Sequence, residues 1–167
     1  VAAQNKLRGT FTQHPGSEIR LKGFDGFSET VFSTDTIAAN GAFSLKIPKY
    51  TGTGVLEIKG AGSLLVLLSG EKKVQISALQ IQDYQNLQIN NSLENDYLAT
   101  YIKQQGVRNQ KLSGWKWLKP IYQSEDNFSA VLSEINKEIN NLEGQEAAYL
   151  RAFPKSKYAS FYLPLRK

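Results

Sequence analysis

Residues 40–48 read Asn-Gly-Ala-Phe-Ser-Leu-Lys-Ile-Pro, and this stretch indicates how the first half of the chain folds. Asn-Gly is the dipeptide that supplies the positive φ angles of tight hairpin turns. The alternation after it places Phe43, Leu45 and Ile47 on one face of a strand and polar residues on the other. The stretch therefore predicts a hairpin turn at Asn-Gly and a half-buried strand after it.

Similar short strands are predicted on both sides of this turn. They alternate apolar and polar residues between glycine-rich turns, and they cover residues 6–12, 18–22, 29–37, 55–59, 63–68, 74–79 and 87–90. Residues 64–68 are apolar without alternation, which predicts a central strand covered on both faces. Residues 1–90 are therefore predicted to form an antiparallel β-sandwich or flattened barrel. The predicted core consists of Phe11, Leu21, Phe43, Leu45, Ile47, Leu65 and Ile76.

The hydrophobic period becomes helical from residue 91 onward. Asn91 and Glu94 have the spacing of a capping box, which predicts that a helix starts there and ends at Gly106. Trp115 begins a further group of apolar residues at helical spacing.

A second, longer amphipathic helix is predicted over residues 128–153, with Asp126 or Asn127 as its cap and Pro154 as its stop. Further helical turns are predicted over residues 156–163. The predicted fold class is therefore α+β, with the sandwich at 1–90 and a packed C-terminal helical segment at 91–167, together forming one structural unit.

The composition excludes several chemistries. The chain has 167 residues, a formal net charge of +5, one histidine and no cysteine. Without a thiol the chain cannot carry out thiol catalysis, form a disulfide or bind a metal through thiolates, and one histidine makes a zinc site built by the protein improbable. The longest apolar run, residues 64–68, is far too short to span a bilayer. No catalytic, cofactor-binding or metal-binding residues are therefore assigned.

The candidate functional stretch lies between Asp96 and Glu125, where no acidic residue occurs. Basic residues alternate there with aromatic ones, and the candidate contact surface consists of Tyr101, Lys111, Trp115, Lys116, Trp117, Lys119 and Tyr122. This composition has three interpretations: packing in the core, a contact with a protein or glycan, and stacking on nucleic acid. Positive charge is spread over both halves of the chain, which argues against a nucleic-acid partner. We expect Trp115 or Trp117 to be partly exposed beside Lys116 or Lys119 and to take part in self-association or partner docking.

Other candidate residues have simpler interpretations. His14 lies between Gln13 and Pro15 in a predicted turn, without the serine and acid that a catalytic triad requires. Glu134 and Glu138 stand one helical turn apart, but both lie off the apolar stripe of their helix, as expected for a solvated face.

The chain opens with Val1-Ala2-Ala3-Gln4 and contains no methionine, which indicates a processed product or an excised fragment. Val-Ala-Ala has the small-x-small form that leader peptidases accept, and a fragment boundary is the alternative. The lack of cysteine is consistent with export. The expected location is periplasmic or secreted, in a parent protein that could be anchored to a membrane.

Short motifs across nearly the whole chain resemble a bacterial module. They are Leu7-Arg8-Gly9-Thr10-Phe11, Asp35-Thr36 before Asn40-Gly41-x-Phe43, Leu67-Leu68-Ser69-Gly70-Glu71 before Val74-Gln75-Ile76, Asn95-Asp96-Tyr97, and Phe153-Pro154-x-Ser156 followed by Tyr158, Phe161 and Leu163. The chain is similar to the N-terminal domain of unknown function that precedes the thioredoxin-like domain in Bacteroidetes-type thiol–disulfide oxidoreductases. In that family a Cys-x-x-Cys pair on the downstream domain performs the redox step. The resemblance implies no redox residue here, because the chain has no cysteine.

Two hypotheses follow. The first is a non-catalytic accessory domain of an exported thioredoxin-like oxidoreductase, which contributes substrate contact, partner contact or dimerisation. The second is a free-standing exported β-sandwich that binds a glycan or peptide through Trp115, Trp117 and the surrounding lysines. The first predicts that the parent reading frame continues into a thioredoxin-like domain, and the second predicts a stop codon near Lys167.

Overall fold

The computed structural model describes residues 5–151, and Leu150 is described in its backbone alone. Its elements in chain order are β1 (Lys6–Phe11), β2 (Glu18–Asp25), β3 (Ser28–Thr36), β4 (Ala42–Lys46), β5 (Gly52–Ile58), β6 (Gly62–Leu68), β7 (Lys73–Ala78), β8 (Gln88–Asn90), α1 (Leu93–Tyr122) and α2 (Phe128–Arg151). The predictions made for residues 1–4, for the end of the second helix at 152–154 and for helical turns at 156–163 lie outside the described residues.

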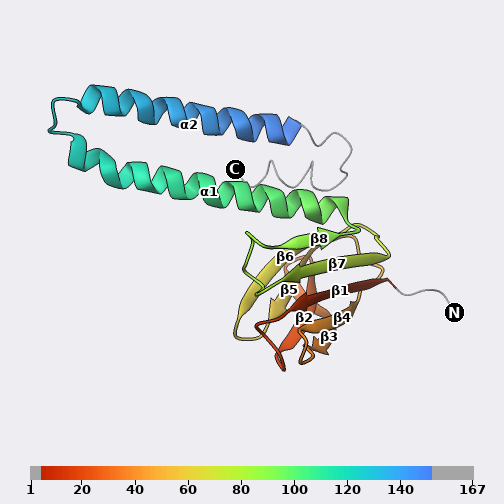
Figure 1. The fold of residues 1–167 in the computed structure, drawn as a ribbon. Coiled ribbons are helices and arrows are strands. Elements are labelled where there is room, and N and C mark those ends of the chain that lie inside the picture. The colour runs from red at the N-terminus through yellow and green to blue at the C-terminus, as the bar shows by residue number, and fades with distance from the viewer. Residues whose placement is uncertain (1–4, 152–167) are drawn as a thin grey trace.

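The strands form two four-stranded sheets that pack face to face, with the orders β4-β1-β7-β8 and β3-β2-β5-β6. The helices follow the strands in sequence and lie on one side of the sandwich (Figure 1), so the α+β fold class is confirmed. All neighbouring strands are antiparallel except β1 and β7, which are parallel. The prediction of a purely antiparallel sandwich is wrong at this one pair, because β7 joins the first sheet only after the chain has crossed the second.

The Asn-Gly turn also differs from its prediction. The strands on its two sides, β3 and β4, belong to different sheets, so the turn makes a corner and not a hairpin. Of its two residues only Gly41 has a positive φ, of 84°. The Asn40 side chain accepts a hydrogen bond from the Ala42 N–H (3.1 Å), which bends the chain locally.

The core of the sandwich lies between the two sheets. Phe11, Leu21, Phe43, Leu45, Ile47 and Ile76 are buried there as predicted, and the rings of Phe11 and Phe43 stack with centroids 5.3 Å apart. Leu65 is only partly buried, and it packs with Leu67 under α1 in a second, smaller cluster. Strand β6 is therefore covered on both faces, as predicted. It lies at the edge of its sheet and not at the centre, because α1 supplies the outer cover.

The start of α1 is fastened to this edge by a buried side chain. Asn95 is 2% exposed; its Oδ1 accepts from the Leu67 N–H (2.7 Å) and its Nδ2 donates to the Leu67 carbonyl (2.7 Å). Ser92 is the N-cap and accepts from the Asn95 backbone N–H (3.3 Å). The Ser92 hydroxyl donates to the Glu71 carboxylate (2.7 Å), and that carboxylate also accepts from the Ser69 N–H (3.1 Å). The predicted cap at Asn91 is therefore wrong by one residue.

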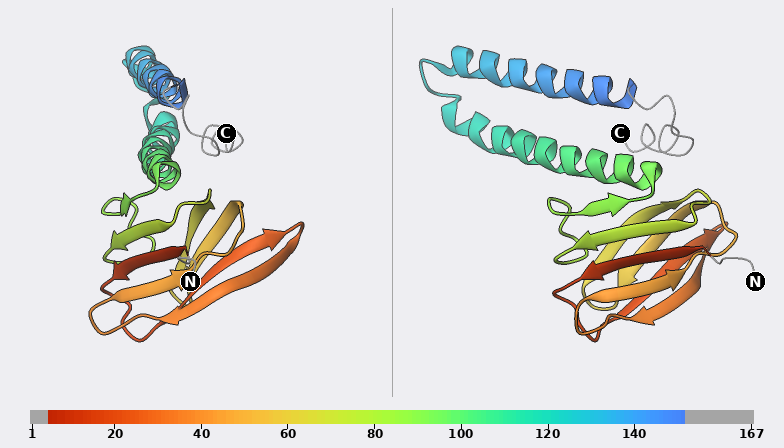
Figure 2. Two further views of the ribbon diagram at one scale, coloured as in Figure 1. Left: turned by 90° about the vertical axis from the view of Figure 1, so that its right-hand side faces the viewer. Right: turned by 45° about the vertical axis from the view of Figure 1, so that its right-hand side comes forward.

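Helix α1 continues through Gly106 and reaches Tyr122, so the predicted end at Gly106 is also wrong. Gly106 has no positive φ, and one glycine inside a helix costs only about 1 kcal/mol. The resulting helix has 30 residues and is about 45 Å long. It extends past the edge of the sandwich, and α2 runs back beside it on the side away from the sheets (Figures 1 and 2). No helix among the described residues combines the length and apolar character needed to cross a bilayer.

The Asn95 contacts give a test of the attachment. Replacing Asn95 with alanine leaves the Leu67 N–H and carbonyl without their partner in a buried position, at about 1–3 kcal/mol per group. We therefore expect Asn95→Ala to lower the free energy of unfolding by about 2–4 kcal/mol in urea titrations followed by circular dichroism. The matched control is Asn136→Ala, at an exposed position of α2, where we expect a change within about 0.5 kcal/mol. If the two variants unfold at the same urea concentration, Asn95 does not have this role.

Candidate functional site

The two helices face each other along an inner stripe of α1. Tyr101, Arg108, Trp115 and Tyr122 follow one another at seven-residue spacing, which places them on one side of the helix. Tyr101 is buried, and the other three are half-buried. Because Tyr101 and Arg108 both contact Glu146 of α2, this side is the one that faces the second helix.

Glu146 is the centre of the polar contacts between the helices. Its side chain is 10% exposed, and its carboxylate accepts hydrogen bonds from Gln105 Nε2 (2.6 Å) and the Tyr101 hydroxyl (3.1 Å). The Arg108 guanidinium lies 3.7 Å from the same carboxylate, and its Nε has no hydrogen-bond partner among the described residues. Glu146 therefore compensates a partly buried cation and holds α2 against α1.

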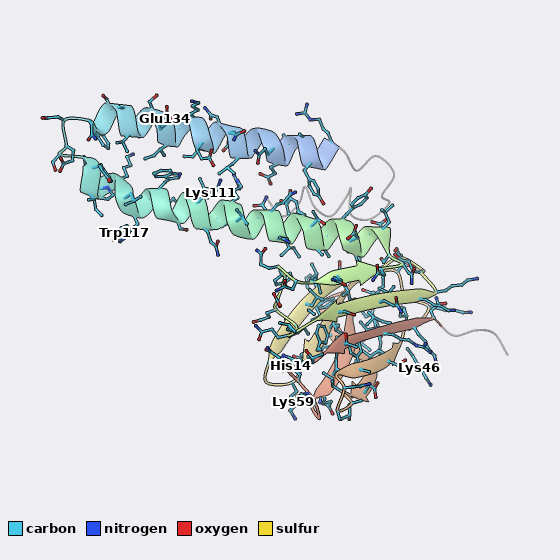
Figure 3. The ribbon with its side chains drawn as sticks, in the orientation of Figure 1. His14, Lys46, Lys59, Lys111, Trp117 and Glu134 are labelled. Carbon is cyan, nitrogen blue, oxygen red and sulfur yellow. The ribbon has the colours of Figure 1, made fainter. Side chains whose placement is uncertain are left out.

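Further along the hairpin, Lys111 donates to Glu138 at 2.6 Å. This hydrogen bond is the main reason that the pKa of the Glu138 carboxyl lies below its usual range. Figure 3 shows Lys111 on the side of α1 that faces α2. Glu134 is 74% exposed and lies 3.7 Å from Lys137, so Glu134 and Glu138 do not form a paired carboxylate site.

A groove of about 800 Å³ is lined mainly by α1 and α2, with Tyr84 and Leu87 of the sandwich at one end. Its lining includes Lys103, which donates to the Gln85 carbonyl (3.1 Å), and Tyr149, which donates to the Tyr97 carbonyl (3.2 Å). Burial raises the pKa of Tyr149 to about 12, so this phenol remains a protonated donor at neutral pH. The polar side chains of the groove join the elements around it, which favours a structural joint over a reactive site.

The opposite side of α1 presents an uncharged, solvent-exposed surface that we call the outer α1 face. It consists of Gly106, Val107, Gln110, Ser113, Gly114, Trp117, Pro120 and Ile121, all of which are exposed. Val107 lies at its margin, because it also lines the groove. Trp117 is 70% exposed, Ile121 50% and Val107 40%. Figure 3 shows Trp117 on the side of α1 that points away from α2.

The residues predicted as one contact surface are divided between these two faces. Tyr101, Trp115, Tyr122 and Lys111 belong to the inner side, whereas Trp117 lies on the outer α1 face. Lys116 and Lys119 are exposed. The exposure expected for one of the two tryptophans is found at Trp117, and its role in contacts stays a prediction.

The sequence reasoning missed Val107, Gly114 and Ile121. Their seven-residue spacing was the available signal, and it could be used only once the helix was known to continue through Gly106.

No other group of chemically active side chains emerges from the described residues. His14 is partly buried in the turn after β1, and its Nε2 has no hydrogen-bond partner there. Among residues 5–151, no three side chains of histidine, cysteine, aspartate or glutamate gather as they would around a metal ion.

The Glu146 contacts lead to a prediction for the hairpin. In Glu146→Ala, Tyr101 and Gln105 lose an acceptor and the Arg108 guanidinium loses its nearer carboxylate. We expect a loss of about 1–3 kcal/mol in the free energy of unfolding and faster hydrogen exchange in α2. Glu134→Ala, at an exposed glutamate of the same helix, should change little. If the two variants unfold at the same urea concentration, Glu146 does not hold the helices together.

No family model, no curated protein and no solved structure matches this chain. The family resemblance of the sequence motifs therefore stays an expectation. The geometry of the outer α1 face is the feature from which a function can be inferred.

Proposed function

We propose that this chain is a non-catalytic contact module in which the sandwich is the scaffold and the α1–α2 hairpin is an arm that docks on a protein surface. The observation that carries this proposal is the outer α1 face, where Trp117, Ile121 and Val107 are exposed on one side of a projecting helix. Exposed apolar groups that cluster on one surface commonly mark interaction sites.

The physical argument concerns the hydration of these side chains. Burying one large apolar side chain fully in an interface contributes about 1.5–3 kcal/mol of favourable free energy. Tryptophan is enriched among the residues that contribute most to protein interfaces, and a rim of charged groups around such residues is typical. Lys116 and Lys119 are exposed in the same part of α1 and could form that rim.

The setting we propose is the one implied by the sequence resemblance. The chain would be the accessory domain that precedes a thioredoxin-like domain in an exported disulfide oxidoreductase. A Cys-x-x-Cys pair on that second domain would perform the redox chemistry, because this chain has no cysteine. The arm would contact a protein substrate, a partner or a second enzyme molecule.

The parent gene gives the first test of this setting. The reading frame that encodes this chain should continue past Lys167 into a thioredoxin-like sequence with Cys-x-x-Cys. A stop codon there would contradict the setting and favour a free-standing exported module that binds a glycan or peptide.

The activity prediction uses insulin as a protein disulfide substrate. The chain alone should not accelerate insulin reduction by dithiothreitol, because it has no thiolate to attack a disulfide. In the parent enzyme, we expect Trp117→Ala to lower kcat/KM for insulin about thirtyfold, since truncating a central interface tryptophan costs about 2 kcal/mol. Turnover of a small disulfide, oxidised glutathione, should stay unchanged.

Phe27→Ala is the matched control, because Phe27 is a fully exposed aromatic residue in the β2–β3 turn of the sandwich. Equal effects of Phe27→Ala and Trp117→Ala on insulin turnover would contradict a docking role of the arm. Reductase activity of the chain alone would contradict the non-catalytic assignment.

A further inference from the structure

We propose that the outer α1 face binds the same face of a second copy of this chain, with the two α1 helices antiparallel and a two-fold axis passing at Gly114. This inference rests on the proposed function, because it takes the outer α1 face as a contact surface and names its occupant.

The spacing of residues on this face suits such a pairing. Val107, Gly114 and Ile121 are seven residues apart, so Val107 and Ile121 lie at equal distances of about 10 Å on either side of Gly114. Pairing across Gly114 places Val107 of each copy against the partner's Ile121, so the same contact forms twice. Gly114 and Ser113 are small, so the two helices could approach closely at the axis.

Charge at the two ends of the face favours the antiparallel direction. Lys103 lies one helical turn before Val107, and Glu125 and Asp126 follow α1 in the turn to α2. In an antiparallel pair, Lys103 of each copy would lie near Glu125 and Asp126 of the partner subunit. A parallel pair would instead bring together lysine with lysine and acid with acid, which is unfavourable.

The fold leaves room for the second helix. Lys103 donates to the carbonyl of Gln85, which lies just before β8. The sandwich therefore covers α1 as far as Lys103. The exposed positions of the outer α1 face begin directly after it, at Gly106. Figure 1 shows that α1 extends past the edge of the sandwich. The partner's α1–α2 turn would therefore end beside Lys103, next to this edge.

An acidic segment of another protein is the main alternative occupant, since Lys116 and Lys119 are exposed in the same part of α1. The face itself is uncharged between Gly106 and Ile121, so a complementary surface needs apolar and small residues rather than carboxylates. A second copy provides such a surface and also provides acids at its ends. One pair of helices makes a small interface, so we expect a reversible dimer that forms at concentrations of about 10–100 µM.

The chain has no cysteine, so single cysteines can be introduced as specific cross-linking sites. Gly114→Cys should form a covalent dimer on mild oxidation, because the two copies of this residue meet at the axis. Val107→Cys and Ile121→Cys should each fail to cross-link alone, since their own copies lie about 20 Å apart along the helices. A mixture of these two variants should cross-link efficiently.

Asn136→Cys on α2 and Phe27→Cys in the β2–β3 turn are matched controls, because both positions are exposed and lie off the outer α1 face. Lys103→Glu should weaken the dimer in sedimentation, and combining it with Glu125→Lys and Asp126→Lys should restore it. Self-linking of Val107→Cys would show a parallel pair and overturn the proposal, as would cross-linking of the controls at the same rate.

A wild-type chain that sediments as a monomer at about 100 µM, with no cross-linking of Gly114→Cys or of the Val107→Cys and Ile121→Cys mixture, would also overturn the proposal. The insulin assay reports separately on the contact-module function. Selective loss of insulin turnover in Trp117→Ala together with a monomeric wild-type chain would therefore reject the second copy and leave the docking function supported.

Discussion

The geometry of this protein depends on the side-chain amide of Asn95, which bonds to both polar backbone groups of Leu67. Leu67 lies on β6, an edge strand whose outer backbone groups would otherwise lack partners. The amide acts as a short piece of neighbouring strand and fixes where α1 begins. Because Ser92 and Glu71 complete the same network, the end of β6, the start of β7 and the N-terminus of α1 are joined at one point.

At the opposite edge of the sandwich, side-chain hydrogen bonds also join the two sheets. Ser33 and Asp35 of β3 accept hydrogen bonds from the N–H groups of Lys46 and Ser44 on β4, at 3.0 and 2.7 Å. Side chains therefore bridge the two sheets at β3 and β4, and α1 covers the gap between β6 and β8. The two sheets are therefore joined by side chains at one edge and covered by α1 at the other, as in a flattened barrel. Beyond this contact, α1 extends away from the sandwich as the arm. The arm has an inner side held by Glu146 and an outer side open to water.

Much of the fold could be predicted from local patterns, whereas the relations between distant segments could not. The alternation at Phe43, Leu45 and Ile47 defines a buried face, and it does so whichever sheet the strand joins. The same pattern does not reveal that β4 pairs with β1, or that β1 and β7 are parallel, because strand partners are set by the whole core. The division of the candidate contact residues between two sides of α1 could not be predicted for a related reason: a mixture of basic and aromatic residues shows no separate faces until one continuous helix is known. Trp115 and Trp117 are two residues apart, yet a helix turns them to different sides.

The most direct test of the account is the fluorescence of Trp117 in a Trp115→Phe variant, where it is the one remaining tryptophan. In dilute solution it should emit as a water-exposed indole that iodide quenches readily. As the protein concentration rises from about 1 to 100 µM, the emission should shift to shorter wavelength and the quenching should fall, because the second copy covers the indole. The Trp117→Phe variant, which reports on Trp115, should change little. Emission from Trp117 that is already shielded in dilute solution would contradict the exposed outer α1 face, and emission that does not change with concentration would contradict its pairing with a second copy.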